Sequence, residues 1–300
     1  MEERLTRQHS SSVVDEHPLP SATRPTTVIQ PTTGWAPVRL GDLLRFRELL
    51  YFLVWSELKV RYKQTVLGAA WAVIQPLAIM VVFTVFFGIV VRVPTGEIPY
   101  PIFAFSGVVV WQYFATALNR ASNSMLEQQA LITKVYFPRL VVPVAPVVAG
   151  LVDFAFAFAV LVPLISLYPE AGFSPTTAVF TLPLFLLLAV ISALSVSLWL
   201  SALMVQYRDV RLLMNVIMQL WFFATPIIYP SSLVPESWRP FYEALNPMVG
   251  VVEGFRWALL GGAEAPNPTT LAISVALVVV VLVGGLYYFR RVERIFADVV

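Results

Sequence analysis

Long apolar stretches separated by short polar segments dominate the chain from residue 69 onward. A helix needs about 20 apolar residues to cross the hydrocarbon core of a bilayer, so each long stretch predicts a membrane-spanning helix. The predicted spans are residues 69–91, 101–118, 141–168, 178–205, 212–229 and 270–289. The pattern therefore predicts an all-α integral membrane protein, with six transmembrane helices in a domain over residues 67–300. The first span is expected to be broken by Pro76.

The residues before the first span fall into two parts. Residues 1–37 mix Ser, Thr, Pro and charged residues, a composition typical of a disordered tail. Residues 38–66 alternate apolar and polar positions with helical spacing, but their apolar run 49–55 is too short to cross a membrane. We expect an amphipathic helix in the membrane interface over 38–66. A plain juxtamembrane helix remains the alternative.

Composition narrows the possible chemistry. Of the 300 residues, 58% are hydrophobic and 13% charged, and there is no cysteine, which removes disulfides and thiolate chemistry. The two histidines, His9 and His17, lie in the polar tail. The chain contains no GxxxxGK[ST] phosphate-binding loop and no HExxH zinc motif. No N-terminal signal peptide is recognisable. We expect no catalytic residue, no metal site and no cofactor bound by this chain.

The distribution of basic residues predicts the orientation. With six spans and a cytoplasmic N-terminus, 17 of the 20 Lys and Arg residues face the cytoplasm, as the positive-inside rule requires. Both termini are then cytoplasmic. A seventh span at 245–262 would move the basic C-terminal residues outside, so this stretch is predicted to be re-entrant from the outer face. Glu253 and Arg256 within it are spaced i, i+3 and are expected to neutralise each other.

The same orientation places the polar segment 119–146 in the cytoplasm. Ser122, Asn123 and Ser124 resemble the capping residues of a helix start, so we predict a separate cytoplasmic helix over 122–133. Such a helix can transmit force from a soluble partner. An ordinary loop helix without a partner is the alternative.

Two features inside the spans are candidates for function. Asp153 is the only ionisable acid within the six predicted spans, which makes it a candidate functional group, although a structural hydrogen bond explains it as well. Aromatic residues are dense in the first, second and fifth spans, and sugar rings bind aromatic faces. For any single ring, core packing or interface anchoring is the competing interpretation.

Several short motifs in order resemble the membrane subunit of bacterial ABC-2 type polysaccharide exporters, the permeases for O-antigen, capsule and teichoic acid chains. The similarity covers residues 40–296. The matching segments are Arg61–Trp71, Gln75–Leu77, Tyr100–Pro101, Phe105–Gly107 with Trp111, Leu131–Arg139, Tyr207–Val210, Thr225–Pro230, Asn246–Met248 and Gly254–Arg256. The long tail 1–37 departs from the family.

The resemblance implies a homodimer in the bacterial inner membrane that works with two separate ATPase subunits, which hold ATP and Mg. It implies a cytoplasmic coupling helix seated on the ATPase and re-entrant helices between spans five and six that close the outer mouth. Residues implied to contact the ATPase are Ser122, Asn123, Glu127, Gln128, Lys134 and Arg139. Residues implied to line the sugar channel are Trp71, Phe83, Phe87, Trp221, Phe222 and Tyr229.

The predicted function is that of a permease that exports a lipid-linked polysaccharide, with no nucleic-acid partner. Arg61 and Lys63 lie near the predicted inner headgroup level, where they would attract the pyrophosphate of the lipid carrier. One alternative is an ABC-2 permease for a drug or a small lipid. The other is a membrane-embedded transferase acting on polyprenyl lipids, a class that normally shows acidic clusters at the membrane surface, and this chain has only scattered acids.

Overall fold

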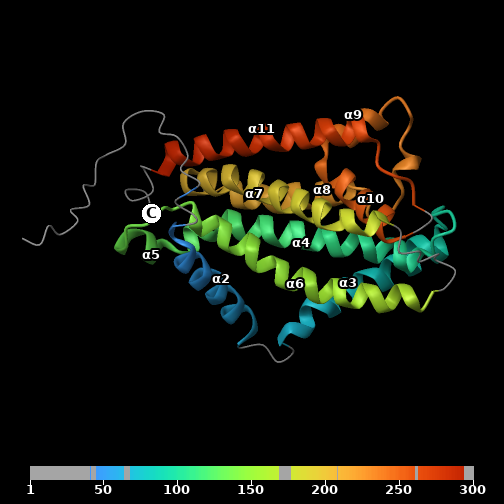
Figure 1. The fold of residues 1–300 in the computed structure, drawn as a ribbon, viewed down its shortest axis with the longest axis horizontal. Helices are drawn as coiled ribbons and strands as arrows, with labels where there is room; N and C mark the ends of the chain where they lie inside the picture. Colours follow the sequence, from blue (N-terminus) through green and yellow to red (C-terminus); the bar gives the residue numbers. More distant parts are fainter. Residues whose placement is uncertain are drawn as a thin grey trace, which may run out of the picture. The chain divides into compact units, whose positions relative to one another are not determined.

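The computed structural model describes residues 41, 45–63, 68–168, 177–207, 209–260 and 263–293. All regular secondary structure in these residues is helical (Figure 1), which confirms the predicted all-α membrane fold class. The predicted tail 1–37, the ends of the predicted interface helix and Arg208 lie outside the described residues.

Five helical segments are long and apolar enough to cross a membrane. α3 (Trp71–Phe83) follows a short turn, η1 (Gly68–Ala70), and continues into the wider π-helical segment η2 (Thr84–Val90). Pro76 lies inside α3 without ending it, so the expected break there does not occur. The other four segments are α4 (Tyr100–Glu127), α6 (Val141–Ser166), η4 (Thr177–Thr181) with α7 (Leu182–Gln206), and α11 (Pro268–Glu293).

The predicted span at 212–229 is shorter than the pattern suggested. Its helix, α8 (Val210–Phe223), has 14 residues, about 21 Å at 1.5 Å per residue, against about 30 Å of hydrocarbon. Helical hydrogen bonding stops at the Thr225–Pro226 turn, since proline has no N–H to donate and disfavours a helical residue before it. The apolar residues after Phe223 therefore form a buried turn and do not continue the helix.

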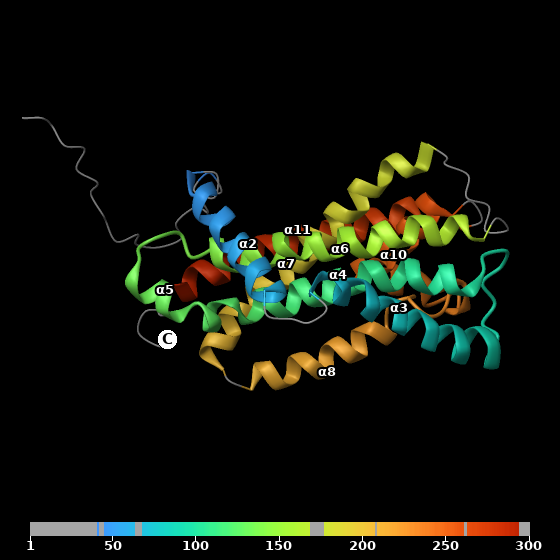
Figure 2. The same ribbon diagram turned by 90° about the horizontal axis from the view of Figure 1, so that it is seen from below.

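α4 is the central element of the described bundle. It packs against α6 on one side and α7 on another, while α11 packs along α7 (Figures 1 and 2). Most α4 side chains from Tyr100 to Met125 are buried, whereas most of the α3–η2 segment is not. A helix that is apolar and covered on nearly all sides is the expected centre of a membrane bundle.

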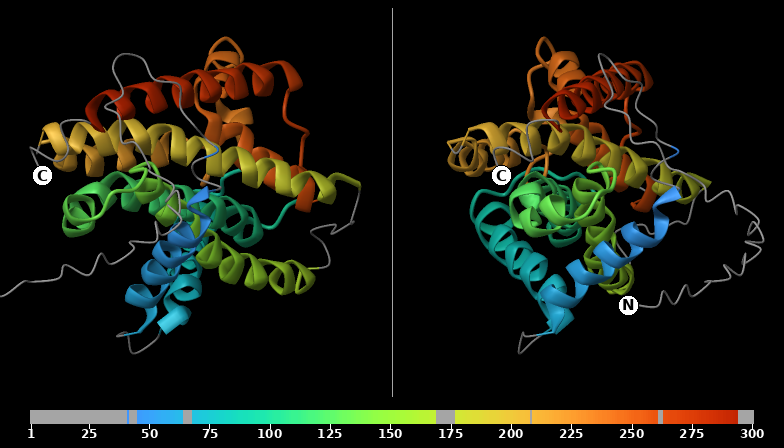
Figure 3. Two further views of the ribbon diagram at one scale, coloured as in Figure 1. Left: turned by 60° about the vertical axis from the view of Figure 1, so that its left-hand side comes forward. Right: turned by 90° about the vertical axis from the view of Figure 1, so that its left-hand side faces the viewer.

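α2 (Arg47–Tyr62) lies within the predicted interface helix 38–66 and runs obliquely across α6 (Figures 1 and 3). Leu53 is its buried residue and packs with Val141 and Ala145 of α6. Its exposed large apolar residues are Tyr51, Phe52, Trp55 and Val60. An exposed aromatic face of this kind suits the headgroup boundary of a bilayer.

The separate helix predicted over 122–133 is wrong. α4 continues without interruption to Glu127, and only after a break at Gln128 does the short α5 (Gln129–Lys134) begin.

The polar side chains that resembled a cap explain the error. Ser122 donates to Leu118 O at 2.7 Å, and Ser124 donates to Ala121 O at 2.7 Å. Hydroxyls bonded back to carbonyls three or four residues earlier are typical of a helix interior in a buried setting, not of its first residue.

The re-entrant stretch consists of two short helices after η5 (Ser231–Leu233), namely α9 (Arg239–Leu245) and α10 (Pro247–Leu259). α10 is buried along most of its length and packs against α7 and α4. Asn246 caps α10, because its side chain accepts from Met248 N at 3.1 Å.

Candidate functional site

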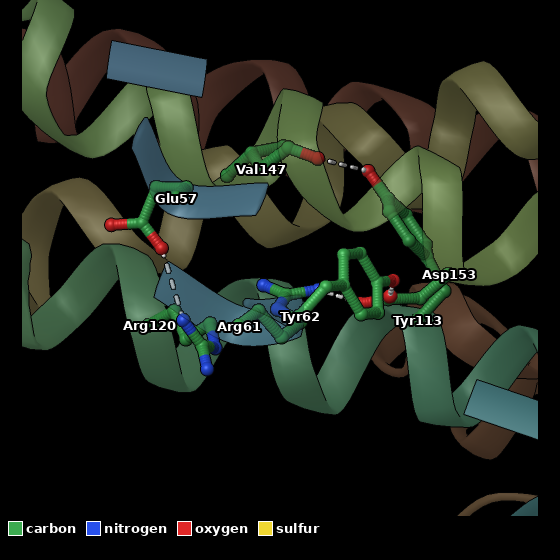
Figure 4. Close-up of polar contacts among 7 residues, drawn as sticks. All are labelled: Glu57, Arg61, Tyr62, Tyr113, Arg120, Val147 and Asp153. Atoms are coloured by element: carbon green, nitrogen blue, oxygen red, sulfur yellow. Dashed lines mark hydrogen bonds and ion pairs between the residues drawn. The ribbon is translucent and has the colours of Figure 1, made fainter. Parts of the chain in front are cut away.

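A group of charged side chains joins α2 to the bundle (Figure 4). The Arg61 guanidinium pairs with the Asp153 carboxylate on α6, and the Tyr62 hydroxyl donates to the same carboxylate. One helical turn earlier on α2, Glu57 pairs with Arg120 of α4 at 3.0 Å. The end of α2 is thus held by two ion pairs, one to α6 and one to α4.

A cavity of about 280 Å³ opens beside this group, between α2, α3, α4 and α6. Its wall combines charged, amide, hydroxyl and aromatic groups. The polar and aromatic residues that line it are Arg61, Tyr62, Trp71, Gln75, Gln112, Tyr113, Thr116, Arg120, Asp153 and Phe154. The two arginines give it hydrogen-bond donors suited to carboxylate or phosphate oxygens.

Burial and neighbouring charge shape the protonation of the α2 residues. Burial, and next the nearby Arg120 charge, lower the pKa of the Arg61 guanidinium, although arginine stays charged at neutral pH. Burial raises the pKa of the Tyr62 hydroxyl, which keeps it protonated and able to donate. The cavity therefore presents a fixed cation and a fixed hydroxyl donor.

The two residues predicted to meet a lipid headgroup are placed differently. Arg61 turns inward, half-buried, and is already paired with Asp153. Lys63, at the end of α2, is exposed. The structure thus separates a cation inside the cavity from a cation at the surface.

Four of the six residues predicted to line a sugar channel lie in one aromatic cluster. Phe83 contacts Phe87 and Phe222, with ring centroids 5.8 and 5.7 Å apart. Trp221 lies edge-to-face against Phe114 of α4, 5.0 Å between centroids. All four are half-buried against the core of the bundle.

The other two stand apart. Trp71 is 53% exposed and lines the polar cavity. Tyr229 follows α8, where its hydroxyl donates to Phe223 O at 2.8 Å and lies 3.2 Å from the Tyr242 hydroxyl.

The residues predicted to contact an ATPase divide by exposure. Ser122 and Asn123 are buried inside the end of α4, while Glu127 and Lys134 are exposed and Gln128 is half-buried at the break. The Arg139 guanidinium donates to Glu293 O at the end of α11.

Two neighbouring residues complete the surface of this segment. Val135 and Tyr136, directly after α5, are exposed, Tyr136 by 82%. Apolar side chains so exposed at the end of the bundle are typical of contact surfaces.

Among the described residues, Glu253 and Arg256 do not approach within salt-bridge distance, although their opposite charges act on each other. Instead the Arg256 guanidinium donates to Phe103 O at 3.1 and 3.2 Å, Pro226 O at 2.5 Å and Ile227 O at 2.7 Å. The guanidinium stays charged at neutral pH, as arginine does in proteins. The carbonyls of Pro226 and Ile227, in the turn after α8 where helical bonding stops, are thus satisfied by a buried cation.

Sequence reasoning singled out Asp153 and Arg61 separately but did not join them. A lone carboxylate in a span needs a basic partner, but Arg120, Lys134 and Arg139 all lie closer to Asp153 along the chain than Arg61 does. No signal in the sequence therefore singled out Arg61. Nothing in the pattern pointed to the Glu57–Arg120 pair, since both residues lie on polar faces of different helices.

These helices and the buried charge group define a multi-pass membrane protein whose polar site lies where an interface helix meets the bundle. The profile of the ABC-2 type transporter family matches residues 48–260, and the chain belongs to this family. The resemblance seen in the motifs is thereby confirmed.

Named relatives narrow the comparison. The chain is 32% identical over 259 residues to the O-antigen export system permease protein RfbA of Myxococcus xanthus, covering 86% of this chain and 97% of that protein. It is 30% identical to the permease of the same name from Klebsiella pneumoniae, covering 84% and 95%. It is 23% identical to the polysialic acid transport protein KpsM of Escherichia coli, covering 79% and 91%.

Proposed function

We propose that this chain is the permease subunit of an ABC exporter that moves a lipid-linked polysaccharide outward across the bacterial inner membrane. The observation that carries the proposal is the similarity to O-antigen export permeases over nearly their whole length. A drug or small-lipid permease of the same family would not be expected to match those relatives from end to end.

In this proposal, ATP hydrolysis by a separate protein drives the transport. The sequence has no phosphate-binding loop, so ATP and Mg belong to two ATPase subunits that bind a homodimer of this chain. With both termini in the cytoplasm, the ATPase would contact the exposed residues around the α4–α5 break. Glu127, Gln128 and Lys134 are accessible there, whereas Ser122 and Asn123 would act only by supporting the end of α4.

The lipid carrier would enter near α2. Lys63 at the surface offers a first cation to a pyrophosphate headgroup, and Arg61 offers a second one at the cavity. Reversing both charges should abolish export of a purified lipid-linked glycan. Unchanged export by that double variant would remove the headgroup role from the proposal.

The glycan would pass along aromatic rings. Trp71 beside the cavity is exposed enough to stack on a sugar in the structure as it stands. The half-buried rings Phe83, Phe87, Trp221, Phe222 and Tyr229 would reach a sugar only after the helices around them separate.

The decisive experiment is reconstitution of the chain with its genomic ATPase partner in liposomes. Transport of a lipid-linked polysaccharide should depend on ATP, and a small hydrophobic drug should not be transported. Glu127→Arg with Gln128→Ala should lower both export and stimulated ATP hydrolysis.

Glu236→Arg is the matched control, since Glu236 is equally exposed but lies in the segment between α8 and α9 that is predicted to face outward. Drug transport without glycan transport would reject the proposed substrate class. Full coupling in the Glu127→Arg, Gln128→Ala variant would reject this loop as the ATPase contact.

A further inference from the structure

Asp153 is the only charged residue within the six predicted spans. A carboxylate in such a segment is costly unless it is paired, and both of its partners in the structure come from α2. Arg61 supplies the charge and Tyr62 supplies a hydroxyl, from adjacent positions at the last turn of the helix. The last turn of α2 is therefore joined to α6 through one carboxylate, next to the Glu57–Arg120 pair that joins α2 to α4.

α2 and α6 also contact each other through apolar side chains. Leu53 packs with Val141 and Ala145, and the other apolar residues of this small cluster are only partly buried. The aromatic side chains Tyr51, Phe52 and Trp55 of α2 are exposed and add nothing to this contact. Loss of the Arg61–Asp153 pair would leave α2 joined to α6 through these apolar contacts alone, with no ion pair between the two helices among the described residues.

The cavity beside the pair has a balanced set of charges. Arg61 and Arg120 both line it, and Asp153 and Glu57 each neutralise one of them. A phosphate group entering this cavity would bind best to a guanidinium, but the Arg61 guanidinium is already paired with the Asp153 carboxylate. The phosphate and Asp153 would then compete for the same donors.

We propose that Asp153 is an internal counter-ion for Arg61 and Tyr62, and that a phosphate group entering the cavity takes its place and releases α2 from α6. The proposal rests on the proposed function, because it assigns a response to the same headgroup site. A phosphate carries more charge than a carboxylate and accepts from arginine in a bidentate manner, so it can displace a single carboxylate. The ligand class is a mono- or diphosphate, whether on a polyprenyl lipid or free in solution.

A thiol accessibility experiment tests this release. The chain has no cysteine, so a single introduced thiol is the only reactive one. Ala145→Cys places it on the face of α6 that α2 covers. The full chain would be placed in phosphatidylcholine nanodiscs and labelled with N-ethylmaleimide, with polyprenyl diphosphate, inorganic pyrophosphate or uncharged polyprenol added.

Labelling of Ala145→Cys should become several-fold faster with polyprenyl diphosphate and stay slow with polyprenol. Acceleration by inorganic pyrophosphate alone would support displacement and identify a soluble anion as its source. No acceleration by either phosphate would overturn the proposal. Ala117→Cys, in the buried core of α4, should stay slow throughout, and Glu97→Cys, exposed in the segment before α4, should stay fast throughout.

A binding measurement separates competition from a merely structural role. Asp153→Asn should bind polyprenyl diphosphate several-fold more tightly than the parent chain, because the competing charge is gone. Arg61→Gln should bind it several-fold more weakly. Weaker binding in both variants would overturn the counter-ion role, since a structural defect lowers affinity in either case.

These assays contain no ATPase and no polysaccharide. Their failure would leave the proposed transport function standing. Conversely, if reconstituted export failed while phosphate still released α2, the substrate class would need revision and the counter-ion role would not.

Discussion

The Trp221 indole N–H donates to the Asn246 side-chain oxygen at 2.9 Å and so ties the end of α8 to the start of α10. The same amide group donates to Ala224 O at 2.9 Å and to the Thr225 hydroxyl at 3.1 Å. One side chain therefore caps α10, fixes the turn after α8 and orients one of the candidate channel rings.

Replacing Asn246 should loosen all of these elements together. Asn246→Ala removes the cap and leaves donors and acceptors without partners, and we expect a loss of about 2–4 kcal/mol. Asn246→Asp keeps the two accepted bonds and should cost less, about 1–2 kcal/mol. Thermal unfolding of the purified protein in detergent measures both. An equal loss in the two variants would show that the donated bonds, not the cap, hold the junction.

Gly107 should tolerate no side chain. A Cβ at this position on α4 would lie 2.7 Å from the Arg256 Nη2 atom, and Arg256 cannot move without giving up its carbonyl partners. Gly107→Ala should therefore destabilise the fold by about 1–3 kcal/mol. Gly150→Ala is the matched control, because its Cβ would meet a Tyr113 ring atom at 3.3 Å and should cost less. The denaturation midpoints should rank parent, Gly150→Ala, Gly107→Ala; the reverse order of the two variants would contradict the account.

The Phe222 ring could serve the packing of the bundle or contact with the sugar, and substitutions at this position distinguish the two roles. Phe222 contacts Phe83 and Trp111 with ring centroids 5.7 Å apart in each pair, so Phe222→Ala should cost about 2–4 kcal/mol. Phe222→Leu fills most of the space and should retain stability. If Phe222→Leu also retains export, the ring serves packing; if it abolishes export in a stable protein, the ring contacts the glycan.

Trp71→Ala should lower export with little change in the free energy of unfolding, because half of the Trp71 surface is already exposed.

We expect the exposed residues at the end of α5 and directly after it to contact the ATPase but to contribute little to the stability of the fold. Tyr136→Ala with Lys134→Glu alters exposed side chains, so unfolding should change by less than about 0.5 kcal/mol while stimulation of the ATPase falls. Arg139→Ala, by contrast, removes the bond to Glu293 O and should lower stability. Hydrolysis rates with and without the permease provide the readout. Unchanged stimulation in the double variant would place the contact elsewhere.

The hydrophobic pattern was enough to locate most of the long helices, because a membrane-spanning helix needs an apolar stretch of about 20 residues that is easy to recognise in a sequence. Five of the predicted spans coincide with helices of spanning length. The span at 212–229 differs because apolarity does not distinguish a helix from the buried turn around Pro226. The helix start at Ser122 was misread for a related reason: hydroxyl residues cap helices in water but bond to their own backbone inside them.

The candidate site was harder to predict, because it consists of ion pairs between residues that are far apart in the sequence. Arg61 and Asp153 are 92 positions apart, and no local rule joins them. Arg256 was assigned to Glu253 by helical spacing, yet carbonyls on two other segments satisfied it. Local periodicity predicts which residues share a face of one helix, while the partner of a buried charge depends on tertiary packing.

α4 runs as one helix from Tyr100 to Glu127, about 42 Å at 1.5 Å per residue. Near one end, the Phe103 carbonyl accepts from Arg256, and at the other end lies the exposed α4–α5 segment. Because α4 is one continuous helix, a displacement of its Glu127 end along the axis would also move the Phe103 carbonyl and, through it, Arg256. The Pro226 and Ile227 carbonyls, which bind the same guanidinium, would respond with it.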